Sequence, residues 1–230
     1  KIQDNCLYLE DRLKDMNERG IEIQVLSCVP IMFSYDAPNN EACVVSKFIN
    51  DFLQYCVKKY PKRFMALGTL PMQDVDNCLK TISVNKDLIG YQIGSNINGL
   101  NLDNPKFEPI YKKLEENNLI LFVHPWNMMG QEEMKEYWLP WLVGMPAETS
   151  RAICSMIFGG IFDKFSNLKV VFAHGGGCFC GTLGRIEHGY NVRPDLCATK
   201  CNFSPKHYCG KFYVDSLVHS KDDLHNIIRT

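Results

Sequence analysis

Several features that assign proteins to large classes are missing from this sequence. No apolar run approaches the roughly 18 residues that a membrane-spanning helix needs. Residues 1–5 lack the apolar core of a secretory signal peptide. The formal net charge is -1, so the chain has no excess of positive charge to attract nucleic acid or an anionic membrane. These absences lead us to expect a cytoplasmic, soluble globular protein that binds neither nucleic acid nor membranes.

Cysteine is abundant, but the spacing that marks strong zinc motifs is absent. The chain has 11 cysteines and no Cys-x-x-Cys pair. Most lie within apolar helix or strand patterns, where cysteine behaves as a small hydrophobic residue. The clearest examples are Cys28, Cys56, Cys78 and Cys154. With no secretory signal, we expect reduced thiols. A structural zinc site formed by Cys197, Cys201 and Cys209 remains a minor alternative.

What the sequence does contain is an alternation of short apolar segments with amphipathic ones. Six segments are predicted as strands: 21–30, 65–70, 89–94, 119–123, 168–172 and 212–217. They are mostly apolar on both faces, which is typical of parallel strands buried on both sides. Helices are predicted between them. The first begins at Asp4 and ends at Gly20. The second covers about 40–60, with Ile49 and Phe52 facing inward.

The alternation is compatible with a (β/α)8 barrel or with an open doubly wound sheet. A closed barrel needs eight strands, and six are found. No strand precedes the first helix, and the sequence stops at Thr230 in or just after a helix. We therefore expect residues 1–230 to form a single α/β domain, a TIM-type barrel fragment of about six strand–helix units. Two unpaired strand edges would be exposed.

Two of the predicted strands end in histidine. His124 is followed by Pro125, and His174 is followed by three glycines, residues 175–177. Because functional side chains gather where parallel strands end, both imidazoles are expected at the same mouth. Neutral imidazole is a common metal ligand and a common general base. The alternative is a pair of hydrogen-bonded core histidines.

The glycines after His174 permit other interpretations, since they suit a tight turn or an anion site before a helix. However, Cys180 stands where a dinucleotide fingerprint needs glycine, and Thr182 stands where a P-loop needs lysine. No serine lies in a Gly-x-Ser-x-Gly elbow, which excludes an α/β-hydrolase nucleophile.

Arg185 falls on the helix predicted after the glycines. Its planar guanidinium suits a carboxylate substrate, and the alternative is a surface salt bridge with Glu187. Asp215 ends the last strand and is a candidate for supporting the site. The remaining histidines have no distinctive context and are expected to be surface or structural residues: His188, His207, His219 and His225.

Three segments, 121–126, 137–149 and 172–177, closely resemble the aminocarboxymuconate-semialdehyde decarboxylase family of the amidohydrolase superfamily. Weaker similarity runs through 30–35, 68–73 and 193–197. The Trp-Leu-Pro-Trp segment, 138–141, makes the resemblance specific to this decarboxylase family. The resemblance implies a metal-dependent hydrolase-type (β/α)8 barrel, usually a homodimer, with zinc. It implies non-oxidative decarboxylation of a dicarboxylate semialdehyde, 2-amino-3-carboxymuconate 6-semialdehyde, to 2-aminomuconate 6-semialdehyde. That reaction belongs to tryptophan (kynurenine) catabolism and diverts flux from quinolinate and NAD synthesis.

The resemblance also implies roles for individual residues. His124 looks like a zinc ligand. His174 is similar to the histidine that holds or activates the metal-bound water and acts as acid and base. Arg185 is similar to an arginine that reaches a substrate carboxylate from the neighbouring subunit. Trp141 and Met128 resemble pocket-wall positions.

The sequence departs from the family pattern at the metal site. The family's His-x-His pair, its Gly-Thr-Asp aspartate and an early-loop arginine have no counterpart here. Catalytic zinc normally has three protein ligands and water, so this chain alone is expected to bind zinc weakly or not at all. Two alternatives stay open. One is another amidohydrolase-type hydrolase or aromatic-acid decarboxylase. The other is an inactive truncated form that acts only by association with full-length subunits.

Overall fold

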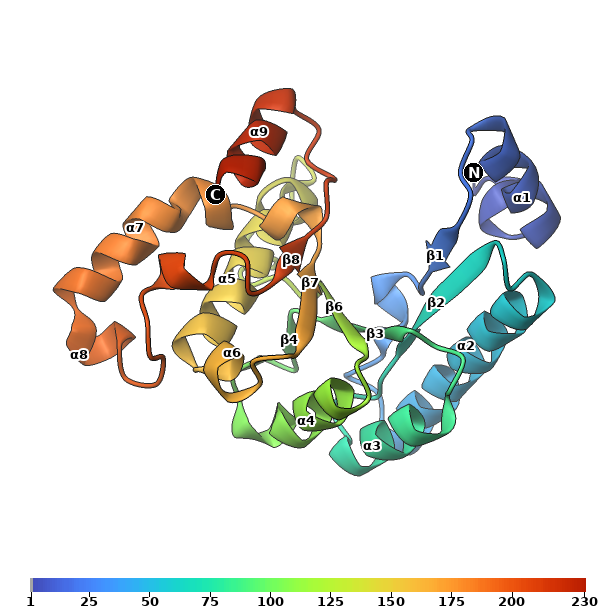
Figure 1. Ribbon diagram of the computed structural model, residues 1–230, viewed down its shortest axis with the longest axis horizontal. Helices are drawn as coiled ribbons and strands as arrows, with labels where there is room; N and C mark the ends of the chain where they lie inside the picture. The colour runs from blue at the N-terminus through green and yellow to red at the C-terminus, as the bar shows by residue number, and fades with distance from the viewer. Residues whose placement is uncertain (1) are drawn as a thin grey trace.

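The computed structural model describes residues 2–230, and six parallel strands form its centre (Figure 1). They are β1 (Gln24–Leu26), β2 (Phe64–Thr69), β3 (Gly90–Gly94), β6 (Ile120–His124), β7 (Lys169–Phe172) and β8 (Tyr213–Val214). They pair in this order along the sheet. Because the spatial order follows the chain order, the fold is a curled, incomplete barrel and not a doubly wound sheet, as predicted.

Helices alternate with these strands. They are α1 (Leu9–Glu18), α2 (Asn39–Lys59), α3 (Val75–Val84), α4 (Glu108–Glu116), α5 (Met145–Phe158), α6 (Ile161–Lys164), α7 (Phe179–Val192), α8 (Pro194–Cys197) and α9 (Lys221–Arg229). A small antiparallel hairpin, β4 (Asn96–Ile97) with β5 (Leu100–Asn101), follows β3. In Figure 1, α1 and β1 lie at one end of the curled sheet, whereas β8 and α9 lie at the other. None of the helices among residues 2–230 has both the length and the apolar character needed to cross a membrane.

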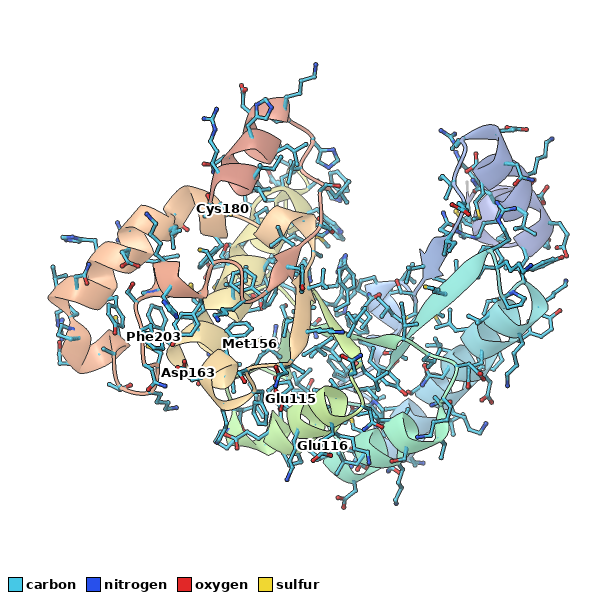
Figure 2. All side chains as sticks on the ribbon, viewed as in Figure 1. Glu115, Glu116, Met156, Asp163, Cys180 and Phe203 are labelled. Carbon is cyan, nitrogen blue, oxygen red and sulfur yellow. The ribbon has the colours of Figure 1, made fainter. Side chains whose placement is uncertain are left out.

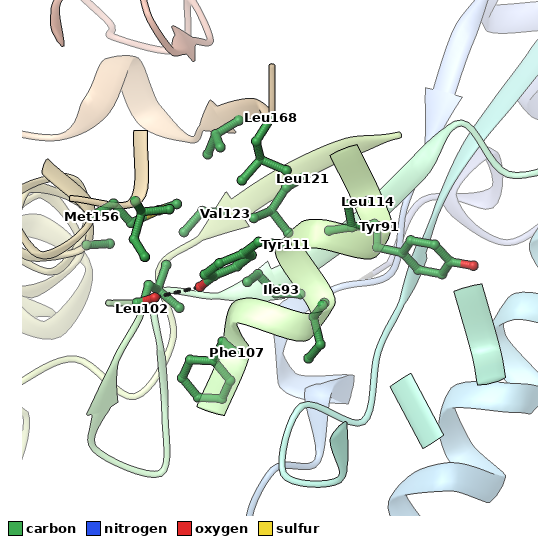
Figure 3. Packing of buried hydrophobic residues seen from close by; sticks show 14 of the residues in the cluster. Tyr91, Ile93, Leu102, Phe107, Tyr111, Leu114, Leu121, Val123, Met156 and Leu168 are labelled. Atoms are coloured by element: carbon green, nitrogen blue, oxygen red, sulfur yellow. Dashed lines mark hydrogen bonds between the residues drawn. The ribbon is translucent and has the colours of Figure 1, made fainter. Parts of the chain in front are cut away.

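The register of the strands explains which face is buried. Tyr91, Leu121 and Val170 are neighbours on adjacent strands, and all three are fully buried. Figure 3 shows Tyr91 and Leu121 among the packed side chains of this outer face, together with Leu114 of α4. Side chains alternate between the faces of a strand, so the intervening residues face the interior of the incomplete barrel. The helices therefore cover one face of the sheet and leave the other to the barrel interior.

Near the two edges of the sheet, the inner face is open. Val25 and Met65 are paired residues of β1 and β2, and their exposed fractions are 48% and 41%. Tyr213 of β8, in register with Val171, is 63% exposed. In the described part of the chain, β1 and β8 each pair with a single neighbouring strand. The apolar pattern predicted burial on both faces of these strands, but the inner face is exposed at the two edges of the sheet.

Some local predictions were wrong. Asp4 begins a short 3-10 turn, and α1 starts at Leu9 without a side-chain cap, because the extended Tyr8 separates the two. On α2, Leu53 is buried and Phe52 is half exposed, because Leu53 continues the inward row from Ile49. The outermost strands, β1 and β8, are shorter than predicted. Each forms backbone hydrogen bonds with one neighbouring strand only, and each ends where that pairing ends.

Other helix boundaries are explained by their capping residues, among them the predicted Gly20. Gly20, with φ of +67°, lies just after α1, where a left-handed residue ends the helix. The Ser220 hydroxyl accepts a hydrogen bond from the Asp223 backbone N–H at 3.3 Å, so Ser220 caps α9. The cysteines are free thiols packed largely as expected, and Cys56 and Cys78 are buried.

The segment that leads from α8 to β8 is anchored on α6. Asp163 accepts hydrogen bonds from the Tyr208 hydroxyl at 2.6 Å and from the Asn202 backbone N–H at 2.9 Å. Phe203 stacks on His207 with ring centroids 4.0 Å apart. Figure 2 labels Asp163 and Phe203 at this contact. His207 therefore has a packing role. The contacts with Asp163 fix the position of the segment that leads into β8.

Candidate active site

The two strand-end histidines lie side by side. His124 is the last residue of β6, and His174 follows β7 after Ala173. Their ring centroids are 4.8 Å apart, with the rings nearly perpendicular. Adjacent parallel strands bring their carboxyl ends to the same edge of the sheet, and this places the two imidazoles at one mouth. The structure therefore brings together the two residues that the sequence singled out.

The surroundings of both histidines favour neutral imidazole. Burial, aided by the neighbouring His174, lowers the pKa of His124 from 6.5 to about 4. Burial also lowers the pKa of His174, and the Asp215 carboxylate opposes this shift. The His124 Nδ1 lies 3.0 Å from the Pro125 carbonyl oxygen. Since a carbonyl only accepts, Nδ1 carries the proton, and Nε2 keeps a lone pair for a metal or a proton.

The half-buried His124 makes stability depend on pH. In the unfolded chain His124 becomes protonated below about pH 6.5, whereas in the folded chain it becomes protonated only below about pH 4. The free energy of unfolding is therefore expected to fall by up to about 3 kcal/mol between these limits and to level off below them. Urea unfolding across this range, in metal-free buffer, measures the effect. The variant His124→Asn serves as the comparison, and an identical pH dependence in both proteins would refute the assignment.

A strained turn holds His174. His174 has φ of +57°, and the next three glycines have φ of +62°, +77° and +65°. Left-handed backbone is uncommon for a non-glycine residue and marks sites where the surrounding structure imposes it. Here Asp215 imposes it. The Asp215 Oδ1 accepts hydrogen bonds from the Gly175 N–H at 2.9 Å and the Leu217 N–H at 3.1 Å. Asp215 thus supports the site through the backbone.

A cavity of about 530 Å³ opens beside His174. Trp138, Trp141 and Leu142 form one wall. The rest comes from the starts of α5 and α7, from the segment 217–219 and from α9. Most of the lining is apolar, which suits an organic substrate held by few polar groups. His219, an exposed residue as predicted, also lines this cavity, which the sequence analysis did not anticipate. Its position in the chain just after β8 was the available signal, because residues after strand ends reach the mouth.

Met128 and Trp141 meet at a second, smaller cavity of about 340 Å³. Met128 is almost fully buried, whereas Trp141 is partly exposed and lines both cavities. Trp141 therefore forms a common wall between the His174 cavity and the space beside Met128.

Arg185 lies elsewhere. It is exposed on α7 and is not among the residues that line either cavity. Glu187, its predicted surface partner, accepts a hydrogen bond from the Lys206 backbone N–H at 2.9 Å. The guanidinium is thus presented on the surface of this chain, outside the mouth that holds the histidines.

The side chains near the two histidines determine whether this chain can hold a metal ion. His124 offers a neutral imidazole with a free Nε2, and His174 lies beside it, so two ligands of the right kind are present. Within residues 2–230, however, no group of three His, Cys, Asp or Glu side chains is arranged to hold a metal ion. Cys197, Cys201 and Cys209 do not form such a group among these residues either. The described residues therefore supply part of a catalytic metal site and do not complete one.

Comparison with known proteins places this arrangement in context. A sequence profile of the amidohydrolase family matches residues 3–223. The 2-amino-3-carboxymuconate-6-semialdehyde decarboxylase of Dictyostelium discoideum is 50% identical over 227 residues, which cover 97% of this chain and 63% of that protein. The decarboxylase of the same name from Caenorhabditis elegans is 37% identical over 281 residues, covering 100% of this chain and 70% of that protein. The chain thus spans about two thirds of the length of these relatives.

Solved structures show the same fold. The 5-carboxyvanillate decarboxylase of Sphingomonas paucimobilis superposes with a TM-score of 0.87 at 26% identity, covering 95% of this chain and 68% of that one. The 5-carboxyvanillate decarboxylase of Novosphingobium aromaticivorans, solved with bound manganese, superposes with a TM-score of 0.85 at 24% identity, covering 95% and 66%. At that identity the second likeness concerns the fold.

Proposed function

The chain belongs to the amidohydrolase family, and from this premise we propose that it carries part of the active site of a carboxy-lyase. The proposed substrate is 2-amino-3-carboxymuconate 6-semialdehyde, as the names of the two relatives suggest. The observation that carries the proposal is the pair of half-buried imidazoles, 4.8 Å apart, next to an apolar cavity of about 530 Å³. The proposed place in metabolism is tryptophan catabolism, and the proposed location is the cytoplasm.

His174 is the proposed acid and base. It lines the cavity, and its lowered pKa keeps the imidazole neutral near pH 7, ready to accept a proton. Loss of CO2 leaves an electron pair on the substrate carbon, and a proton must reach that carbon to complete the reaction. A protonated His174 supplies it at the cavity wall. The nearby Asp215 carboxylate favours the charged imidazolium, so the same residue serves both steps.

His124 and His174 are the proposed ligands that this chain contributes to a metal, and zinc is the proposed ion. Two imidazole ligands suit zinc, but a complete catalytic site needs a third protein ligand from outside the described residues. When bound, the ion lowers the pKa of a coordinated water toward neutrality. The free Nε2 of His124 supports this assignment.

A homodimer is the proposed assembly, with Arg185 acting in the cavity of a second copy. Arg185 is exposed and lies outside its own cavities, which supports a role across an interface. An apolar surface borders the cavity at Tyr137, Trp138, Leu142 and Val143, with exposed fractions of 79%, 63%, 58% and 53%. Aromatic residues of this kind are enriched at interfaces. A guanidinium reaching over this surface would pair with a substrate carboxylate.

Two measurements test the proposal. The first is zinc content per purified chain, before and after mild chelation. The second is CO2 release from 2-amino-3-carboxymuconate 6-semialdehyde and from 5-carboxyvanillate, with zinc or manganese added. Turnover of the semialdehyde alone supports the proposal. Preference for the aromatic acid supports the alternative of an aromatic-acid decarboxylase, for which the fold of the solved structures is the supporting observation.

A second candidate function is association without catalysis. It is favoured by the incomplete ligand set within residues 2–230 and by the open strand edges at β1 and β8. Under this alternative the purified chain releases no CO2 and co-purifies with an intact subunit of a related decarboxylase. Absence of both turnover and co-purification would contradict both candidates.

A further inference from the structure

Glu148 is a fully buried carboxylate that none of the roles above uses. It lies in the first turn of α5, inside the segment that carries the resemblance to decarboxylases. Its side chain is 0% exposed. Burying a carboxylate is costly unless hydrogen-bond donors replace the water it loses. The donors around Glu148 therefore indicate what the carboxylate is for.

Four donors from three separate parts of the chain meet this carboxylate. The Oε1 accepts hydrogen bonds from the Ser95 hydroxyl at 3.1 Å and from the Asn96 Nδ2 at 2.9 Å, both just after β3. The Arg151 Nη2, one turn along α5, also donates to Oε1, at 2.5 Å. The Oε2 accepts a single hydrogen bond, from the Met129 backbone N–H at 3.1 Å. The two oxygens thus join α5 to β3 and to the chain after His124.

The same two residues after β3 also hold the backbone between His124 and Met129. The Asn96 Nδ2 donates to the carbonyl oxygens of Trp126 and Asn127, each at 3.2 Å. The Ser95 hydroxyl lies 3.4 Å from both the Trp126 backbone N–H and its carbonyl oxygen. Residues 126–129, called the wall loop here, are therefore fixed at both ends by groups that contact Glu148.

The wall loop forms one side of the site. Met128 packs on the π-helical turn Pro140–Gly144, where a Cβ on Gly144 would lie 3.1 Å from the Met128 Cβ. Trp141 of that turn borders both cavities. Asn127 has φ of +52°, an unfavourable conformation that the surrounding hydrogen bonds must hold. The position of Met128 and Trp141 relative to His124 therefore depends on the wall loop.

We propose that Glu148 is a positioning residue, which fixes the wall loop relative to His124 and thereby sets the shape of the pocket for a carboxylated substrate. The part of this inference that concerns substrate rests on the proposed function. A carboxylate is needed because both oxygen positions receive only donors. A glutamine side chain would have to place its NH2 group at one of the two oxygen positions. The NH2 group would meet fewer donors at the Oε2 position, where there is only one, than at the Oε1 position.

The variant Glu148→Gln tests this directly. The amide oxygen is expected to keep the three donors at the Oε1 position, which turns the amide nitrogen toward the Met129 N–H. Hydrogen exchange of the Met129 amide should then quicken roughly 10-fold to 100-fold, while amides in the central strands keep their wild-type rates. The matched control is Glu116→Gln on α4, an exposed carboxylate whose loss should leave Met129 unchanged.

Two outcomes would overturn the proposal: an unchanged Met129 exchange rate, or an equal increase at all amides, which would indicate a purely structural role. If Glu148→Gln does not fold, Ser95→Ala takes its place. It removes one neutral group and should quicken exchange at Trp126 selectively. In an active preparation, Glu148→Gln should raise KM several-fold with little change in kcat. The exchange measurement needs no turnover, so failure of the decarboxylase proposal is recognised separately by the CO2 assay.

Discussion

Replacing His174 with asparagine is expected to lower kcat for decarboxylation by at least about 100-fold, with a much smaller change in KM. Asparagine is chosen because it tolerates the left-handed backbone at this position, where φ is +57°. The variant keeps the turn and the side-chain volume but loses the group that takes up and returns a proton. The loss should therefore appear in turnover and leave the fold intact.

The measurement compares kcat and KM of the wild-type chain, His174→Asn and a control, His188→Asn. His188 is exposed on α7, outside the residues that line the cavities, so its replacement should change neither constant. Steady-state rates are read in the preparation that shows decarboxylation. Equal losses in kcat and in substrate affinity would count against a catalytic role for His174 and would favour a role in binding alone.

Replacing Gly177 with alanine is expected to lower the free energy of unfolding by at least about 3 kcal/mol. Gly177 has φ of +65° and ψ of -132°, a region open essentially only to glycine. A Cβ there would lie 2.2 Å from the Pro146 carbonyl oxygen and 3.0 Å from the Thr149 Cβ. Backbone on both sides has to move, because neither contact is with a flexible side-chain end.

The matched control is Gly181→Ala, four residues along the chain and inside α7. A Cβ on Gly181 meets no atom within 4 Å, and its φ is not positive, so alanine should stabilise the helix by about 0.5–1 kcal/mol. Urea midpoints of the two variants should therefore move in opposite directions. A Gly177→Ala midpoint equal to wild type would show that the turn after His174 is not constrained as described.

The local elements and the position of the histidines could be predicted because they depend on neighbouring residues. The six strands appear where apolar β-branched and aromatic residues cluster, and the Ser220 hydroxyl caps α9. His124 and His174 were placed together by one rule, that parallel strands end at a common edge. The ring-to-ring distance of 4.8 Å follows from strand spacing and from register.

Features that depend on distant segments could not be predicted. Glu148 reads as an ordinary helical glutamate in the sequence, and its four donors come from residues 95–96, 129 and 151. His219 has no distinctive neighbours, yet it lines the cavity because the anchored segment before β8 delivers it there. Phe52 was assigned inward by periodicity, but only packing against β2 decides between Phe52 and Leu53.

The sequence by itself determined the order of elements, the incomplete (β/α)8 architecture and the strand-end histidines, because hydrophobic periodicity and turn chemistry are local properties. The tertiary structure decided three further features. It placed His219 at the cavity and Arg185 away from it, it imposed the left-handed turn at His174 through Asp215, and it enclosed the carboxylate of Glu148. Each of these depends on contacts between residues far apart in the chain, and such contacts leave no periodic mark on the sequence.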